Sequence, residues 1–461
     1  MSLTKVTYSM IDGGWINPAD YSSLIDAIAA AKANNMIVCL FEDTTIQVPT
    51  NAATLQDVFD YVATSATQVQ VTVNLATGYQ IASSLTLSNG DWSNFNITST
   101  DATVYLTSGF VYTDNIFNFD RAIAPKISIL IDAQGKGRHG INANNCSSIY
   151  VASGKGVKYA GYIGCYVNAG STGYIDSADF SYAGVLSTDP TYIAGATGVS
   201  ARRGSLLDAR AVTVNNSKHY GMSSDQSSKI NAQSAVANDC LSYGIRADEA
   251  SEICAQYASA NNCQIGFYAL GGSTISADST SATGCTSRGY YAANSSTINA
   301  YSGDASNAGE NGFFALDNSK INATSATANT CGTNGFYAQR SSTIEAHSST
   351  ATGNTSAGFS AQQGSIINAE SATATDNGTY GFFTSRASII NANGATATGN
   401  ATSNVYAERA STINFVSGIG ASTTTLDNIY VSNGGIVAAG SATGTLRIAA
   451  NTLTASGIIF Q

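Results

Sequence analysis

Between about residues 198 and 416, the apolar and polar positions of the chain repeat with one period. A glycine recurs after 23 residues, with a single step of 22 between Gly244 and Gly266, and an isoleucine or leucine follows nine positions after each one. Each repeat holds three short runs that alternate between apolar and polar residues, separated by Ser, Gly and Asn. This pattern predicts three β-strands and three turns per repeat.

A repeat of this size cannot bury a face by itself, so neighbouring repeats must stack, each strand pairing with its copy in the next repeat. The pattern therefore predicts an all-β, three-faced parallel β-solenoid. With strands about 4.8 Å apart, the nine steps from Gly198 to Asn404 predict a stack roughly 43 Å long.

Alternation along the strand assigns the side chains to the inside or the outside. The residue after each glycine is apolar and is expected inside, as at Phe267, Phe313 and Phe336. The next position is expected to face outward. It forms a column headed by a cation and followed by aromatic residues: Arg246, Tyr268, Tyr291, Phe314 and Tyr337. An exposed aromatic column predicts either a binding track or a subunit interface.

The remaining sequence divides into flanking segments. The pattern over residues 1–95 predicts an α+β cap with two helices, one capped by Ser22 or Ser23 and another after Thr54, where the capping-box pattern has Asp in place of Glu. Irregular rungs with an insertion are expected over residues 96–197, before the regular array at 198–416. A β-rich tail is expected over residues 417–461.

Composition narrows the possible classes of protein. Only 11% of residues are charged and the net charge is −10, which disfavours nucleic acid as a partner. No stretch is long and apolar enough to span a membrane, and the start lacks the pattern of a signal peptide. We therefore expect a soluble chain with no membrane insertion, exported, if at all, by another route.

The eight cysteines do not suggest a disulfide framework. Four of them occupy the same turn slot of the repeat, where later repeats have asparagine: Cys240, Cys263, Cys285 and Cys331. This slot predicts an internal ladder of small polar groups with free thiols. No CxxC pair, His-rich cluster or calcium-binding nonapeptide occurs, so no metal and no cofactor are expected.

The layout of the whole chain resembles that of bacteriophage tailspikes. The resemblance rests on the start VTYSMIDGGWINPADY, the helix and strand at 23–41, the entry GYQIASSLTLSNGDWSNFNITS, the long solenoid and the closing NTLTASGIIFQ. The similar proteins are depolymerases of capsule or O-antigen, built on a right-handed, pectate-lyase-like parallel β-helix. The resemblance implies a homotrimer on the virion, joined to phage baseplate or tail proteins, that binds and usually cleaves bacterial capsular polysaccharide or O-antigen.

Glycoside hydrolysis needs two carboxyl groups about 5–5.5 Å apart for retention or roughly 6.5–9.5 Å apart for inversion. Stacked rungs about 4.8 Å apart supply both spacings. Asp225 and Asp248 occupy equivalent positions and Glu249 follows, next to the cationic head of the aromatic column at Arg246. These acids are the first candidates for catalysis. A solvated turn in which acids and arginines offset one another is the alternative.

A second group of candidates interrupts a column of asparagines. Glu345 takes an asparagine position, His347 lies two residues further on the same outward side, and Glu370 is equivalent to His347 one rung later. A histidine between two acids can act as acid or base. A surface ion pair is the commoner outcome for such groups.

Other function classes stay open. On the same fold the chain could be a polysaccharide lyase, or a receptor-binding spike that does not cut. A remoter alternative is an ice-binding solenoid, suggested by threonine pairs that recur on the third face. These pairs are Thr350/Thr352, Thr373/Thr375 and Thr396/Thr398. The aromatic column has no role in that last function, and we favour an endo-glycosidase.

Overall fold

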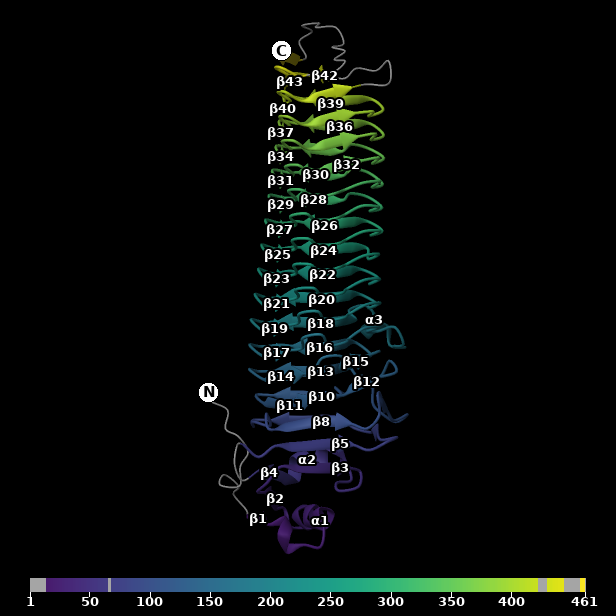
Figure 1. The fold of residues 1–461 in the computed structure, drawn as a ribbon, viewed down its shortest axis with the longest axis vertical. Helices are drawn as coiled ribbons and strands as arrows, with labels where there is room; N and C mark the ends of the chain where they lie inside the picture. Colours follow the sequence, from purple (N-terminus) through teal and green to yellow (C-terminus); the bar gives the residue numbers. More distant parts are fainter. Residues whose placement is uncertain (1–13, 65–67, 422–428, 443–456, 461) are drawn as a thin grey trace. The chain divides into compact units, whose positions relative to one another are not determined.

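The computed structural model describes residues 14–64, 68–421, 429–442 and 457–460. The chain is an all-β parallel solenoid, as the repeat predicts, with few helices. It forms two compact units, unit 1 (residues 1–235) and unit 2 (residues 236–461). Within each unit, strands pair in parallel with their counterparts on the neighbouring rung, and three sheets form the three faces (Figure 1).

The first sheet carries the column of aromatic residues. In unit 1 its strands are β7 (Leu85–Ser88), β10 (Phe117–Asp120), β13 (His139–Asn144), β16 (Ile163–Val167), β18 (Thr197–Arg202) and β20 (Tyr220–Asp225). In unit 2 they are β22 (Tyr243–Ala247), β24 (Ile265–Ala269), β26 (Arg288–Ala292), β28 (Phe313–Leu316), β30 (Phe336–Gln339), β33 (Phe359–Gln362), β36 (Tyr380–Ser385), β39 (Ser403–Glu408) and β42 (Ile429–Ser432).

The second sheet follows the first along each rung. In unit 1 its strands are β3 (Thr44–Val48), β5 (Val71–Leu75), β8 (Phe95–Ser99), β11 (Ile123–Ile127), β14 (Ser148–Val151), β17 (Thr172–Tyr174), β19 (Leu206–Asp208) and β21 (Lys229–Asn231). In unit 2 they are β23 (Glu252–Cys254), β25 (Thr274–Ser276), β27 (Thr297–Asn299), β29 (Lys320–Asn322), β31 (Thr343–Glu345), β34 (Ile366–Asn368), β37 (Ile389–Asn391), β40 (Thr412–Asn414), β43 (Gly435–Ala438) and β44 (Gly457–Phe460). Because β3 pairs with β5, solenoid pairing begins inside the segment expected to form the cap.

The third sheet has shorter strands. In unit 1 they are β6 (Gln80–Ile81), β9 (Val104–Leu106), β12 (Leu130–Asp132) and β15 (Gly156–Lys158). In unit 2 they are β32 (Thr350–Thr352), β35 (Thr373–Thr375), β38 (Thr396–Thr398) and β41 (Ile419–Ala421). A separate small sheet in unit 1 joins β1 (Trp15–Ile16), β2 (Ile37–Leu40) and β4 (Val62–Thr64).

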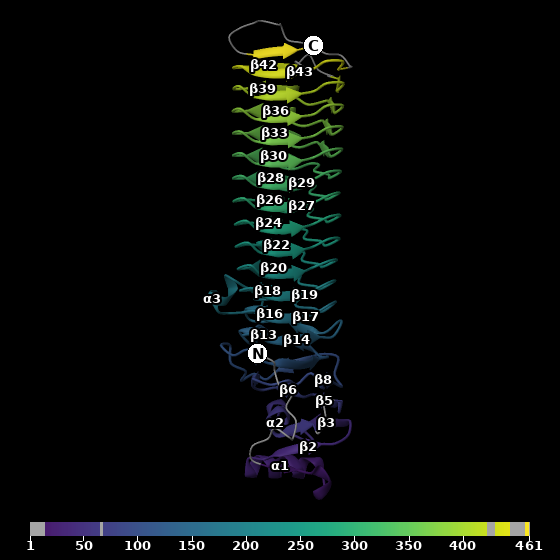
Figure 2. The same cartoon turned by 90° about the vertical axis from the view of Figure 1, so that its left-hand side faces the viewer.

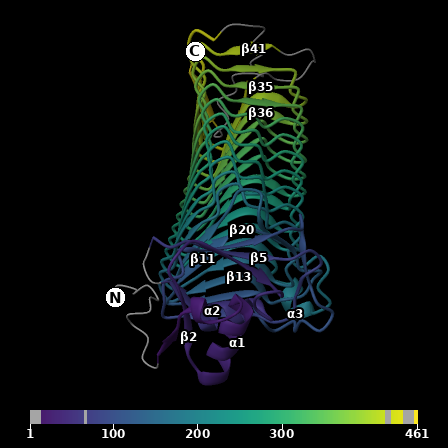
Figure 3. The same cartoon turned by 60° about the horizontal axis from the view of Figure 1, so that its bottom comes forward.

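The two expected helices lie at the N-terminal end of unit 1, next to β2 (Figure 3), and the second of them also contacts β4. Ser23 caps α1 (Leu24–Asn34), and Asn35 ends it in the left-handed conformation. Thr54 and Asp57 form a complete capping box on α2 (Leu55–Tyr61), so both start signals are confirmed. The 3-10 turn η2 (Pro18–Asp20) precedes α1.

The insertion of unit 1 contains one helical turn, α3 (Pro190–Ile193), which stands out beside β18 in Figure 2. In the described part of the chain, no helix is long and apolar enough to cross a membrane.

The core of unit 2 contains a single file of stacked rings, beside columns of buried isoleucine and alanine. Neighbouring ring centroids lie 4.6–5.0 Å apart, which matches the spacing of the rungs. The rings are fully buried and belong to Phe267, Tyr290, Phe313, Phe336, Phe359 and Phe382. The expected inward column is therefore confirmed. The one phenol in this file, Tyr290, is satisfied because its hydroxyl donates to the Thr280 carbonyl at 3.0 Å.

Ladders of polar side chains provide hydrogen-bond partners for the polar groups at the turns. The expected turn slot is buried and its four cysteines are free thiols. In later rungs the Asn354 amide nitrogen donates to Asn377 at 2.9 Å, and Asn377 donates to Asn400 at 2.8 Å. At another turn, a buried serine hydroxyl accepts the backbone N–H of the preceding rung, as Ser342 does from Ser319 at 3.1 Å. Each rung thus binds the next through side chains as well as strands.

The tail continues the stack, since β42 pairs with β39 and β43 pairs with β40 and β44. Residues 443–456 of the expected tail lie outside the described residues.

Candidate functional site

The outward aromatic column of unit 2, which we call the stripe, consists of Tyr268, Tyr291, Phe314 and Tyr337. Successive centroids are 4.9, 5.2 and 4.9 Å apart and the ring planes lie within 8° of parallel. Carbon atoms in contact approach to about 3.5–4.0 Å, so rings with these centroid distances are offset along the stack. The offset leaves part of each half-buried tyrosine ring open to solvent.

Phe314 is less available than expected, because only 6% of it is exposed. The guanidinium of Arg288 lies 5.0 Å from its ring centroid and 4.6 Å from that of Tyr291. The same arginine pairs with Glu310 at 2.9 Å. The open surface of the stripe is therefore that of its three tyrosines, with a cation at its side.

Arg288 was missed by the sequence analysis. It begins β26 three positions before Tyr291, so alternation alone would place it on the opposite side of the sheet, although its guanidinium lies over the Tyr291 ring. A charged residue beside an aromatic column in a chain that is only 11% charged was the signal that could have found it. Tyr243, which begins β22 as Arg288 begins β26, was also missed, and its ring packs edge-on against Tyr268 at 5.0 Å.

The phenols of the stripe are held in their protonated form. Burial, followed by the neighbouring phenols Tyr291 and Tyr243, raises the pKa of Tyr268 to about 12. Burial also raises the pKa of Tyr291 and Tyr337. At neutral pH these hydroxyls can donate hydrogen bonds but are unsuited to act as bases.

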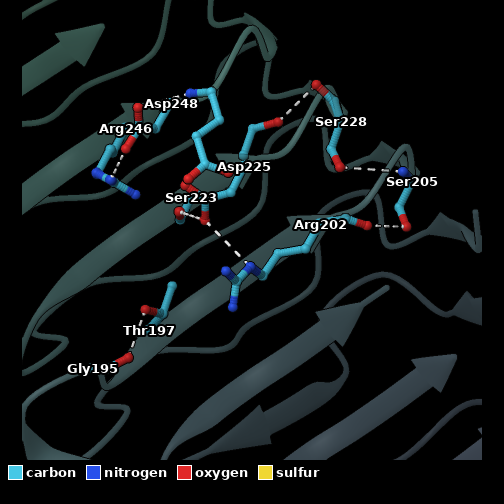
Figure 4. A network of polar contacts seen from close by, with 11 residues as sticks. Gly195, Thr197, Arg202, Ser205, Ser223, Asp225, Ser228, Arg246 and Asp248 are labelled. Carbon is cyan, nitrogen blue, oxygen red and sulfur yellow. Dashed lines mark hydrogen bonds and ion pairs between the residues drawn. The ribbon is translucent and has the colours of Figure 1, made fainter. Parts of the chain in front are cut away.

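In unit 2, the first group of candidate acids lies after β22. Arg246, at the head of the stripe, forms an ion pair with Asp248, as Figure 4 shows. The Asp248 carboxylate also accepts the backbone N–H of Glu249 at 2.7 Å, and the Glu249 side chain is exposed. Arg246 therefore pairs with an acid two residues further along the same rung, just after β22.

Asp225 belongs to unit 1. Its carboxylate accepts the Ser223 hydroxyl at 2.7 Å and lies 3.9 Å from the Arg202 guanidinium (Figure 4). The side chain of Asp225 is 13% exposed and that of Arg202 is 42% exposed. Its polar contacts within unit 1 are therefore with neighbours on the same sheet.

The structure brings the second group of candidates together at the end of the second sheet of unit 2, where β31 and β34 lead into turns. His347 Nε2 lies 3.4 Å from Glu345, and His347 Nδ1 contacts Glu370. Lys320 lies 3.4 Å from the other oxygen of Glu345. The imidazole thus bridges two carboxylates, as the 23-residue spacing predicts, and all three side chains are partly exposed.

A file of amides ends on Glu345. Asn414 donates to Asn391, Asn391 to Asn368 and Asn368 to Glu345, each at 2.7 Å. Every amide points the same way, so the hydrogen bonds polarise one another toward the carboxylate. Burial alone raises the pKa of Glu345, but the Asn368 hydrogen bond and the charge of Lys320 outweigh it and hold the pKa below its usual range. Glu345 is therefore ionised at neutral pH.

Residues 236–368 match the family model for the right-handed β-helix region. This match covers the stripe and the Glu345–His347 pair. It confirms the expected right-handed β-helix in that part of the chain.

Two comparisons with solved structures concern one enzyme. A crystal structure of the periplasmic alginate epimerase AlgG has a TM-score of 0.42 and 10% identity, covering 88% of this chain and 84% of that one. A double mutant of AlgG has a TM-score of 0.42 and 11% identity, covering 84% and 83%. A search of the curated proteins found no match.

The threonine pairs on the third sheet align across β32, β35 and β38, with Thr350 opposite Thr373 and Thr352 opposite Thr375. The Thr352 and Thr375 hydroxyls are 2.9 Å apart. The ice-binding alternative stays a prediction.

Among the described residues, no group of three or more His, Cys, Asp or Glu side chains could hold a metal ion.

His139 of unit 1 gives a pH-dependent prediction. The side chain is buried against Tyr162 and Tyr166, and its Nδ1 atom has no hydrogen-bond partner among the described residues. Burial, with a smaller contribution from Arg138, lowers its pKa from 6.5 to about 3. The unfolded chain binds this proton below pH 6.5 and the folded protein does not, so stability is lost as pH falls toward 3.

We expect unit 1 to lose up to about 1.4 kcal/mol of stability for each pH unit below 6.5. Urea unfolding between pH 6.5 and 5, above the titration of most carboxylates, measures the slope. In His139→Phe the slope should be smaller. An unchanged slope in that variant would show that other groups cause the loss.

Proposed function

We propose that this chain binds a bacterial surface polysaccharide along the stripe and cleaves it, as an endo-glycosidase of the tailspike type. The observation that carries the proposal is the row of offset tyrosine rings on one face of unit 2. Sugar rings pack their apolar faces against aromatic side chains, and the protonated phenols can donate to sugar hydroxyls. A regular row of such rings suits a long, repetitive chain better than a small ligand.

For the cleavage step we favour the Glu345 group. Glu345 is ionised, which suits a base or a nucleophile, and its amide file holds it in one orientation. His347 contacts both Glu345 and Glu370 and could deliver the proton to the leaving oxygen. The Asp225, Asp248 and Glu249 group is the competing location, and its arginines favour charge balance instead.

The proposal includes the setting that the resemblance implies. The chain would act as a homotrimer on a phage virion, attached to baseplate or tail proteins, at the surface of the host bacterium. Capsular polysaccharide or O-antigen would be the substrate.

One observation favours a binder that does not cut. Each of the acids Asp248, Glu345 and Glu370 contacts a cationic or imidazole side chain, so these carboxylates could serve structure alone. A lyase has less support, since the raised pKa of Tyr268 argues against a tyrosine base and leaves His347 as the candidate.

The test is incubation of the purified protein with a panel of bacterial capsules and O-antigens. We expect new reducing ends without the absorbance near 232 nm that elimination produces. Reducing ends together with that absorbance would instead identify a lyase. Binding to one glycan without either signal would leave the receptor-binding function. No binding to any glycan on the panel would contradict the proposal.

A further inference from the structure

A second aromatic surface lies on the second sheet of unit 1, outside all the residues discussed as candidates above. Tyr150 and Tyr174 stack on adjacent rungs with centroids 5.2 Å apart and planes 10° from parallel. A cation covers each end of the pair. Lys126 lies 5.2 Å from the Tyr150 ring, and Arg210 lies 5.9 Å from the Tyr174 ring.

The two cations differ in their partners. Arg210 is held by Asp208 at 3.0 Å and Asp176 at 3.6 Å, and it also donates to the Tyr174 hydroxyl at 3.3 Å. Among the described residues, Lys126 forms no ion pair, and its side chain is exposed. The charge of Arg210 is therefore offset within the protein, whereas that of Lys126 faces solvent.

A hollow of about 290 Å³ opens beside Lys126. Its walls combine aliphatic groups, two serines, the lysine and the tyrosine: Ser93, Ile123, Ala124, Lys126, Ser148, Ile149 and Tyr150. The hollow lies at a local irregularity of the sheet. Here the register of β11 shifts between Ile123 and Lys126, across Pro125. Such a bulge re-aims side chains and interrupts the flat sheet.

We propose that this hollow binds a saccharide that carries an anionic group, a carboxylate or a phosphate. The aliphatic wall and Tyr150 match the apolar face of a sugar ring, the serine hydroxyls match its polar edge, and Lys126 matches the anion. The net charge of −10 does not oppose this, because charges beyond about 8 Å are largely screened at physiological ionic strength. The local charge of Lys126, and not the net charge of the chain, therefore determines whether an anion can bind in the hollow. The inference does not depend on the proposed function of the stripe.

The test uses the full chain and a panel of oligosaccharides that carry galacturonate, glucuronate, N-acetylneuraminate or sugar phosphate. Isothermal titration and saturation-transfer NMR should detect binding of at least one of them. Its neutral counterpart, methyl-esterified or dephosphorylated, should bind at least tenfold more weakly. The carboxylate and phosphate arms of the panel identify which anion is recognised.

Lys126→Met should weaken binding at least tenfold, as expected for the loss of one charged contact. Tyr150→Ala should also weaken it, while Lys155→Met, a cation of unit 1 outside the hollow, should not. The inference fails if no anionic saccharide binds, or if Lys126→Met binds as the wild type does. Loss in Tyr291→Ala without loss in Lys126→Met would assign the saccharide to the stripe, overturning this inference and supporting the proposed function.

Discussion

Replacing Phe336 with alanine is expected to destabilise unit 2 by about 3–5 kcal/mol, the range for truncating a buried phenylalanine. The ring is fully buried and stacks on Phe313 at 4.9 Å and on Phe359 at 4.7 Å. Its loss leaves a gap in the file of rings that neighbours cannot fill, because the backbone hydrogen bonds of each rung fix their spacing. Both adjacent rungs lose a stacking partner.

In a solenoid each rung contacts only its neighbours, so the effect should be greatest near the substitution. Hydrogen exchange measured by mass spectrometry should rise most in peptides that contain β28, β30 and β33, and urea unfolding gives the total change. Phe336→Leu, which keeps most of the volume, should cost less than about 1.5 kcal/mol. Tyr337→Ala removes the outward ring of the same strand and is the matched control. Equal losses in Phe336→Ala and Tyr337→Ala would contradict the assignment of inside and outside.

The sequence predicts the regular part of the fold well because the period fixes the register. Because every rung of the regular array but one holds 23 residues, the inward file at Phe313 and Phe336 and the outward tyrosines follow from alternation alone. The same arithmetic places His347 between Glu345 and Glu370. Local start signals were also sufficient for α1 and α2, since Ser23 and Thr54 cap their helices directly.

Features that depend on side-chain direction could not be predicted in this way. The period places asparagines above Glu345, but it does not say that all three amides donate toward it. Nor does it say that the long side chain of Arg288 folds over Phe314 and covers it. The Lys126 hollow arises from a bulge in an irregular rung, where no repeat exists to reveal the outlier.

The amide file bears directly on the expected effect of Glu345→Gln. If Glu345 is the base or nucleophile, this substitution should lower kcat by about 10²–10⁴ and leave KM nearly unchanged. A glutamine keeps the volume and can still accept from Asn368, so the fold should persist. Tyr291→Ala should instead raise KM, because the stripe binds the glycan in the ground state as well as in the transition state.

Initial rates of reducing-end release on the glycan identified by the panel, measured against substrate concentration, separate these two effects. Asp376→Asn, which changes an exposed acid of unit 2 outside both candidate groups, should behave as the wild type. Asp225→Asn distinguishes the two candidate groups. A loss in Asp225→Asn with full activity in Glu345→Gln would move the catalytic step to the Asp225, Asp248 and Glu249 group. In that case the Glu345, His347 and Glu370 cluster would be a surface ion pair, and its amide file a purely structural ladder.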